Sequence, residues 1–396
     1  MARVISADSH VVEGPGVFAG LAERFGDEAP RIMDTDTETD AIVIPSRGAK
    51  GAGVGRMGLA GLRLRKGATL SRQPGRKPDV TDLTAPDVLE IINLGYAGLR
   101  PGLREGSRRT DDQDLDGLAA EYLYPGFFGM FSMEDPALTV ALHRNYNDWI
   151  RDYAAEADGR LYGLAALPVQ DPTAAAKELA RVIDMGFRGA CIPCTAPAAK
   201  PYHDADYSPI WALAQEAGIP LSMHVGTNSF VPTSLRPPRT TQDTLFGYAT
   251  AQTSIQRTLA DLICRGVAER YPRLRFVVSE FNAGWIAHFL ERLAQGFARE
   301  RRVGREMDMQ HTPSEIWQRQ FYATIEDDQP ALLTRHLIGI DNLMWGCDYP
   351  HTDSTWPCSM AVLDEVMAEL PPVDRDKITR INVAALYGLA EDGLAN

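Results

Sequence analysis

Short runs of apolar residues alternate with longer amphipathic stretches along most of the chain. Eight of these runs are typical of buried strands, and they begin at Arg3, Ala119, Leu161, Gly186, Ile219, Leu274, Phe321 and Leu343. Most stretches between them repeat apolar residues at helical spacing. Alternating strands and helices predict a parallel sheet in an α/β fold. Eight such units in a chain of this length favour a closed (β/α)8 TIM barrel over an open doubly wound sheet.

Two of the predicted helices carry clear start and stop signals. Asp171 is a typical N-cap residue, Pro172 occupies the first helical position, and Gly186 follows as a C-terminal stop. The same three signals recur at Ser208, Pro209 and Gly218. These signals support the helical interpretation of the amphipathic stretches.

The first unit of the barrel differs from the others because about a hundred residues separate its strand from the next one. We assign residues 41–118 to an insertion within one domain that spans residues 1–396. Its segment 50–77 is rich in Gly, Arg and Lys and shows no steady period. Two interpretations stay open: its arginines are solvated or contact another subunit, or one or two of them bind an anionic substrate. These arginines are Arg56, Arg63, Arg65, Arg72 and Arg76.

The overall charge and the cysteine content exclude several classes of protein. A net charge of −13 argues against general binding to nucleic acid or to an anionic membrane. No apolar run reaches the length of about 18 residues that a membrane span needs, and the N-terminus lacks a signal-peptide pattern. Five scattered cysteines suit a reduced cytoplasm better than a disulfide framework. We therefore expect a cytoplasmic protein with a small-molecule substrate.

Acidic and imidazole side chains stand where several predicted strands end. In a (β/α)8 barrel the carboxyl ends of the strands converge on one site. Asp8 and His10 are two residues apart on a strand, so both side chains point to the same face and form a bidentate grip on a metal. His224 and Asp348 end two further strands, and mixed His/Asp ligation suits Zn, Mn or Fe. Other strand-end candidates are Glu121, Glu280, Glu326, Asp328 and His351.

Each of these residues also has a structural interpretation. A single His in an apolar strand is usually a core residue, and Asp348 alone would suit a turn before Pro350. The metal interpretation is favoured because the residues coincide at strand ends. Glu13 is either a ligand or a loop carboxylate, and we favour the loop carboxylate. We interpret Cys191 and Cys194 as small residues of a buried strand. The remaining histidines are taken as structural or exposed: His143, His203, His288, His311 and His336.

Six stretches of the chain resemble the amidohydrolase-2 family of the amidohydrolase superfamily, the branch related to aminocarboxymuconate-semialdehyde decarboxylase and γ-resorcylate decarboxylase. They are "ISADSHVVE", "YSPIWALAQEAGIPLSMHVGT", "LRFVVSEFNAGWIAHFLERL", "PSEIWQRQFYATIEDD", "MWGCDYPHTDSTWP" and "INVAALYGLA". They run from the N-terminus almost to the C-terminus and leave mainly the basic segment unmatched. The resemblance implies a (β/α)8 barrel with one divalent metal, commonly Zn or Mn, and non-oxidative decarboxylation or hydrolysis.

By motif position, the resemblance implies His10, His224 and Asp348 as metal ligands. Asp8 matches the first residue of the family's first-strand pair, a position that is often His or Glu in relatives. The sixth strand departs from the pattern, because "SEFNAG" places Glu280 where better-known decarboxylases carry a His. Glu280 is therefore a candidate both for metal binding and for catalysis, together with Asp348 and His351 as acid or base.

Decarboxylation of a small carboxylic acid is our first expectation, and hydrolysis is the second. A dinuclear Fe or Mn hydroxylase that uses oxygen is an alternative, since the strand-end residues suffice for two metals. A non-catalytic partner of an active paralogue is another. We expect a homo-oligomer or a pairing with a paralogous subunit. Five aromatic residues near strand ends would suit either an aromatic substrate or core packing: Tyr122, Tyr124, Phe127, Phe128 and Trp356.

Overall fold

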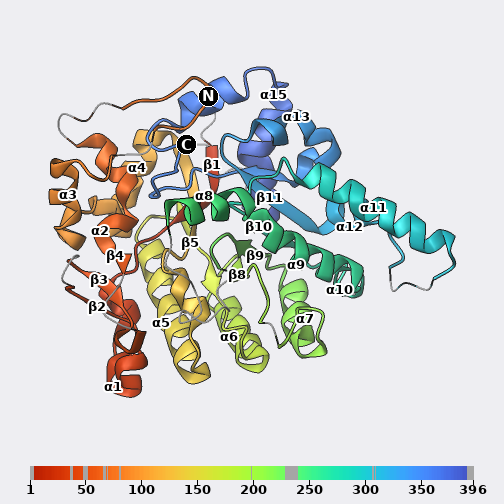
Figure 1. Ribbon diagram of the computed structural model, residues 1–396, viewed down its shortest axis with the longest axis horizontal. Coiled ribbons are helices and arrows are strands. Elements are labelled where there is room, and N and C mark those ends of the chain that lie inside the picture. Colours follow the sequence, from red (N-terminus) through yellow and green to blue (C-terminus); the bar gives the residue numbers. More distant parts are fainter. Residues whose placement is uncertain are drawn as a thin grey trace. The chain divides into compact units, whose positions relative to one another are not determined.

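The chain divides into two compact units in the computed structural model, whose helices and strands are labelled in Figure 1. Among the described residues, the first unit comprises those of 4–166 and 345–370, and the second comprises those of 167–344 and 371–389. The structure describes residues 4–35, 39–47, 52–65, 68, 70–79, 82–197, 199–227, 240–305, 307 and 309–389.

A parallel three-stranded sheet forms the centre of the first unit. Its order is β1 (Val4–His10), β5 (Leu118–Tyr124) and β6 (Leu161–Gly163). Every residue of β1 is buried, as expected for a strand that is covered on both faces. Helix α5 (Pro136–Ala155) packs on β6 and on the short strand β7 (Ala165–Ala166). The run that begins at Leu161 is therefore two strands rather than one.

The segment between β1 and β5 folds into short elements of its own. Its antiparallel sheet has the order β2 (Arg31–Met33), β3 (Ala41–Val43) and β4 (Ala52–Gly53). Its helices are α1 (Leu21–Phe25), α2 (Val54–Met57), α3 (Pro86–Ile92) and α4 (Gly106–Asp116). Leu59, Leu62, Val88 and Ile92 form a small separate core here. Elements of four or seven residues are too short to show a period, which explains why the sequence pattern missed them.

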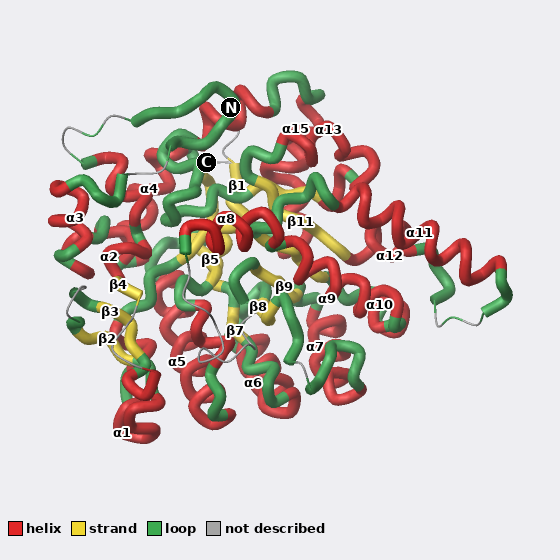
Figure 2. The backbone as a smooth tube through the Cα atoms, viewed as in Figure 1, coloured by secondary structure: helices red, strands yellow, loops and turns green. Residues whose placement is uncertain are grey.

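The second unit alternates parallel strands with helices (Figure 2). Its parallel strands lie in the order β11 (Phe321–Ile325), β10 (Phe276–Ser279), β9 (Leu221–His224) and β8 (Ala190–Pro193). Strand β12 (Leu343–Trp345) follows at the side of β11. The helices between the strands are α6 (Pro172–Asp184), α7 (Ser208–Ala217), α8 (Thr241–Thr250), α9 (Gln252–Cys264), α10 (Val267–Arg270), α11 (Ile286–Arg302), α12 (Pro313–Gln320) and α13 (Gln329–Ile338). Each of the eight predicted strands is thus present in the chain.

Local signals explain where these helices begin, with one correction. Asp171 caps α6 as predicted, because its carboxylate accepts a hydrogen bond from the Ala174 N–H. Ser208 is not an N-cap residue. A 3-10 turn at Ala205–Tyr207 leads directly into α7, and Asp204 caps that turn through the Asp206 N–H. The helical segment therefore starts earlier than the Ser-Pro signal indicated.

The last described segments are helical. They are α14 (Ser359–Val366), α15 (Pro372–Asp376), a π-helical stretch at Lys377–Ile381 and α16 (Asn382–Tyr387). The helical type thus changes from α to π and back to α between Pro372 and Tyr387. No helix among the described residues combines the length and the apolar character that a membrane span requires.

Candidate metal centre

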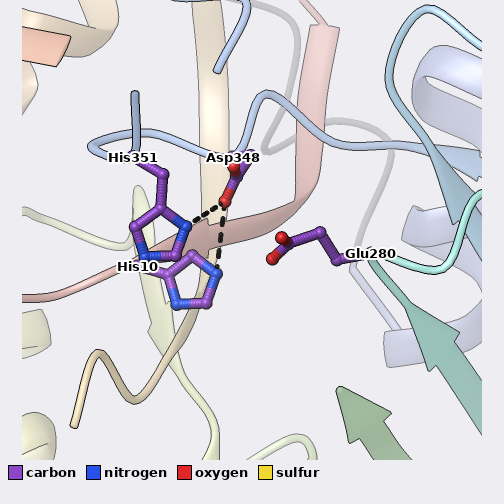
Figure 3. Close-up of side chains that lie close together, drawn as sticks. All are labelled: His10, Glu280, Asp348 and His351. Carbon is purple, nitrogen blue, oxygen red and sulfur yellow. Dashed lines mark hydrogen bonds and ion pairs between the residues drawn. The ribbon is translucent and has the colours of Figure 1, made fainter. Parts of the chain in front are cut away.

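Two histidines and two aspartates gather at the strand ends of the first unit. His10 is the last residue of β1, and its Nε2 lies 3.4 Å from Asp348 Oδ1 and 3.8 Å from Asp8 Oδ1. His351 Nδ1 lies 2.7 Å from the same Asp348 oxygen. Figure 3 shows both imidazoles directed at Asp348. His10 is fully buried, and Asp8 and Asp348 are almost so. The predicted Asp8/His10 pair and the predicted Asp348/His351 pair therefore meet.

The ring of His10 is held in one orientation by the backbone. Its Nδ1 lies 3.0 Å from the carbonyl oxygen of Pro125. Because a carbonyl oxygen only accepts hydrogen bonds, Nδ1 carries the proton, and Nε2 turns its lone pair toward the two carboxylates. The ring of Phe128 contacts the imidazole edge-on, with centroids 5.7 Å apart. His10 is thus prepared as an Nε2 ligand.

The two segments that carry these residues are joined through their main chains. The Asp348 N–H donates to the carbonyl of Asp8 at 2.9 Å, and the His10 N–H donates to the carbonyl of Tyr349 at 2.7 Å. A Cβ at Gly346 would lie only 2.4 Å from the Asp8 Cβ, so glycine is required for this approach. Asp348 itself has a φ of +56°, in the left-handed region. Close backbone contact therefore fixes where Asp348 is presented.

The second unit presents an imidazole and a carboxylate of its own. His224 ends β9, Glu280 follows β10, and His224 Nε2 lies 3.0 Å from Glu280 Oε2. His224 Nδ1 lies 2.8 Å from the carbonyl oxygen of Val225, so this ring also carries its proton on Nδ1. His224 is fully buried, whereas the Glu280 side chain keeps 23% of its surface exposed. The arrangement repeats that of His10: one nitrogen faces a backbone carbonyl and the other a carboxylate.

The position of Glu280 depends on two residues of the neighbouring strand and its loop. Glu280 has a φ of +59°, and its N–H donates to Thr324 Oγ1 at 3.0 Å. Asp328 accepts hydrogen bonds from the N–H groups of Ala283 at 2.6 Å and Gly284 at 2.9 Å. It also caps α13 through the Ala331 N–H. Asp328, a strand-end candidate in the sequence, therefore positions the Glu280 loop.

Glu121 and Glu13 are bound within the first unit. Glu121 forms a buried, bidentate ion pair with Arg109, with two bonds of 2.9 Å. Glu13 accepts hydrogen bonds from the N–H groups of Gly126 at 2.8 Å and Phe127 at 2.9 Å. Burial raises the pKa of Glu13 to about 7. The interpretation of Glu13 as a loop carboxylate agrees with these contacts, although the side chain is buried rather than solvated.

The arginines of the basic segment contact the same unit. Arg63 is buried and donates to the carbonyls of Ser354 at 2.9 Å and Thr352 at 2.5 Å, and also to that of Trp356. Arg72 forms a bidentate pair with Glu365, at 2.7 Å for each bond. Arg63 is therefore not a solvated side chain, and the partly exposed Arg72 is engaged by a carboxylate. They attach the segment to residues 352–365.

The aromatic residues near the strand ends fall into two groups. Tyr122, Tyr124 and Trp356 are fully buried and belong to the core. Phe127 and Phe128 are half-buried and lie beside the loop that holds His10. Core packing thus accounts for three of the five, while the last two remain candidates for contact with a substrate.

The donor atoms fit a divalent metal. In the first unit, ligand atoms of His10, Asp348 and His351 all lie within 4.8 Å of one another. Imidazole nitrogen with carboxylate oxygen is the ligand combination of Zn, Mn and Fe sites. Metal-bound histidines typically donate their other N–H to a carbonyl or carboxylate, as His10 and His224 do. A divalent cation would also compensate the charge of two carboxylates that are buried this deeply.

Comparison with known proteins finds the same family across both units. The model of the family described as Amidohydrolase matches residues 99–389, which is most of the chain. The γ-resorcylate decarboxylase of Polaromonas sp. is 30% identical over 152 residues, which are 36% of this chain and 44% of that enzyme. The chain matches less than two thirds of the length of these curated relatives, between 29% and 59%.

Solved structures share the fold over nearly the whole chain. An amidohydrolase from Mycobacterium avium subsp. paratuberculosis superposes with a TM-score of 0.75 and 21% identity, over 99% of each chain. A 5-carboxyvanillate decarboxylase from Novosphingobium aromaticivorans, complexed with manganese and a substituted benzoic acid, gives a TM-score of 0.65 and 18% identity, over 98% of this chain and 96% of that one. The predicted α/β fold class, a (β/α)8 barrel with a long insertion after its first strand, is confirmed. With the strand-end residues in place and the family model matched over both units, the chain belongs to the amidohydrolase family.

Proposed function

We propose that this protein is a metal-dependent decarboxylase that removes the carboxylate of a small aromatic acid without oxidation. The observation that carries the proposal is the shared orientation of His10 and His224, each with Nδ1 on a backbone carbonyl and Nε2 beside a carboxylate. Support for the reaction comes from relatives named as decarboxylases of γ-resorcylate and of 5-carboxyvanillate. Both names describe aromatic carboxylic acids.

The proposal keeps the metal ligands that the sequence predicts. Asp8, His10, His224 and Asp348 would hold one divalent metal. Each of these residues lies at or just after the end of a strand of the barrel, where active sites of this fold are built. Manganese is our first expectation, since the related carboxyvanillate decarboxylase was solved with it, and zinc is the second.

When bound, a divalent metal polarises substrate oxygens or lowers the pKa of a bound water. The residues of the chain must then hold the acid and supply one proton. In decarboxylation the bond between the ring carbon and the carboxylate carbon breaks, its electron pair stays on the ring carbon, and carbon dioxide leaves. A proton must reach that ring carbon, and we assign this step to Glu280, which takes a proton back from solvent afterwards. Its partly exposed side chain suits such an exchange.

Metal content and anaerobic turnover together test this proposal. Protein purified without added metal or chelator should contain about one equivalent of Mn or Zn, as a single-metal site requires. It should release carbon dioxide from 2,6-dihydroxybenzoate or 5-carboxyvanillate without oxygen. His224→Ala should lose the metal, whereas Glu280→Gln should keep it and lose turnover, because an amide cannot donate a carboxyl proton.

Other results would favour other assignments. Loss of metal in Glu280→Gln would make Glu280 a ligand and transfer the proton step to His351, which contacts Asp348. Turnover that consumes oxygen, with two equivalents of Fe or Mn, would replace the decarboxylase by the dinuclear hydroxylase. Metal-free wild-type protein without activity would contradict the proposal as a whole.

A further inference from the structure

A fully buried arginine connects the insertion to the strand ends of the candidate metal centre. Arg109 lies on α4, and its guanidinium forms the bidentate pair with Glu121 described above. The same guanidinium donates to the carbonyl of His10 through Nη1 and to the carbonyl of Tyr349 through Nη2, each at 3.2 Å. It also stacks over the Tyr349 ring, 4.3 Å from its centroid. One side chain thus contacts both segments that carry candidate ligands.

We propose that Arg109 is a positioning residue, which sets the distance between His10 and Asp348 by holding the two carbonyls of their strand ends. The inference rests on the proposed metal function. His10 is itself a candidate ligand, and Tyr349 directly follows Asp348. A shift of either carbonyl would therefore move a ligand by a similar amount.

Electrostatics explains why this position needs a guanidinium. The carbonyl oxygens of His10 and Tyr349 both face the buried guanidinium of Arg109. Buried carbonyl oxygens without a hydrogen-bond donor are costly, and two of them close together also repel each other. Arginine presents several N–H groups in a rigid plane, so it can satisfy both carbonyls and a carboxylate at once. Lysine offers a single point charge on a flexible stem and cannot reproduce this fork.

A second set of contacts holds Tyr349 at its side-chain hydroxyl. The Tyr349 hydroxyl donates to Asp112 at 2.8 Å, and Arg100 donates to the other oxygen of Asp112 at 2.7 Å through Nε. Arg109 and Asp112 both come from α4, so one helix of the insertion holds both ends of Tyr349. A buried ion pair is weak evidence for a gain in stability. Arg109 instead lies where the segments of His10 and Asp348 meet, which indicates that it controls the distance between these two residues.

The test measures metal affinity and stability separately. The double variant Arg109→Met/Glu121→Leu removes the pair together, so no buried charge is left without its partner. Mn²⁺ affinity is measured from the electron paramagnetic resonance signal of unbound Mn²⁺, and stability from denaturant unfolding of the metal-free protein. We expect Mn²⁺ affinity to fall about 10-fold to 100-fold, the range seen when residues that orient metal ligands are replaced. We expect Arg109→Lys to bind Mn²⁺ more weakly as well.

Arg160→Met is the matched control. Arg160 also donates to two strand carbonyls, those of Leu118 and Ala119, and pairs with a carboxylate, Asp114. It does so where β5 begins, whereas the candidate ligands lie where the strands end. This control should keep wild-type Mn²⁺ affinity whatever its stability.

Each outcome has a defined meaning. A folded double variant with wild-type Mn²⁺ affinity overturns the inference, as does a loss of stability without a change in affinity. If the double variant does not fold, wild-type affinity in Arg109→Lys overturns it in the same way. Wild-type protein that binds no Mn²⁺ or Zn²⁺ contradicts the proposed function instead, so the two failures are distinguishable.

Discussion

Two side chains of the candidate site are carried by backbone in the left-handed region. Glu280 and Asp348 have φ values of +59° and +56°. Aspartate is one of the residues that adopt this region more readily, whereas glutamate seldom does, and such backbone strain often accompanies functional sites. In both cases the residue donates its N–H to a neighbouring strand: Glu280 to Thr324 Oγ1, and Asp348 to the carbonyl of Asp8. The position of each carboxylate is therefore set by the fold around it.

The buried carboxyl of Glu13 should give the protein a characteristic pH dependence. Burial raises its pKa from 4.5 to about 7. Between these values the folded state binds more protons than the unfolded state, so the free energy of unfolding falls as the pH rises through this window. The fall due to Glu13 is about 3 kcal/mol by linkage. Glu13→Gln mimics the protonated carboxyl and should lack this part of the pH dependence.

Denaturant unfolding of metal-free wild type and Glu13→Gln between about pH 5 and about pH 7.5 checks this prediction. Asp116, whose pKa burial also raises to about 7, is present in both proteins and cancels in the comparison. If the free energy of unfolding changed with pH in the same way in both proteins, the raised pKa of the buried Glu13 carboxyl would be contradicted.

At the level of elements, a single carboxylate joins the α13 N-terminus to the loop that presents Glu280. Asp328 accepts hydrogen bonds from the N–H groups of Ala283, Gly284 and Ala331. Asp328→Ala should lower the free energy of unfolding by about 1–3 kcal/mol, because buried N–H groups lose their acceptor. It should also lower kcat, because the Glu280 loop is released.

Asp171→Ala provides the control for this prediction. Asp171 caps α6 through the Ala174 N–H but holds no loop of the site. Asp171→Ala should lower the free energy of unfolding by about 1 kcal/mol and leave kcat unchanged. Unfolding curves and steady-state kinetics on both variants separate the two roles. Equal kcat values in Asp328→Ala and Asp171→Ala would show that Asp328 acts only as a helix cap.

The elements that the sequence predicted well are those whose buried apolar residues form a short continuous run or recur at helical spacing. Strands β1 and β9 are continuous buried runs that end in a histidine, so both the strands and these candidate residues were recognised. Helix α4 has neither pattern. Its buried face carries Arg109, Asp112, Gln113 and Asp116, polar residues at helical spacing that pattern rules assign to solvent. The role of Arg109 was therefore missed. A polar face repeated at i, i+3, i+4 and i+7 was the signal that could have found it.

At the scale of the whole molecule, the sequence predicted the barrel from the alternation of strands and helices. The family match supports that order across both units. What the sequence could not supply is the content of the insertion. Its small core joins short elements that are distant in sequence, through Leu59, Leu62, Val88 and Ile92. A periodic pattern of apolar residues predicts only local structure, so it does not predict such contacts.

A metal held by the predicted ligands would protect the strands that carry them, and this protection is the most direct test of the proposed ligand set. A ligand at about 100 times its Kd stabilises the state that binds it by about 2.7 kcal/mol. If Asp8, His10, Asp348 and His224 hold one ion, Mn²⁺ should slow amide hydrogen exchange in β1 and in β9 together, measured by mass spectrometry of peptic peptides. His224→Ala should abolish the slowing in β1 as well as in β9, because the proposal has all four residues hold the same ion. Slowing that persists in β1 of this variant would mean that His10, Asp348 and His351 bind metal without His224, and that His224 serves another purpose.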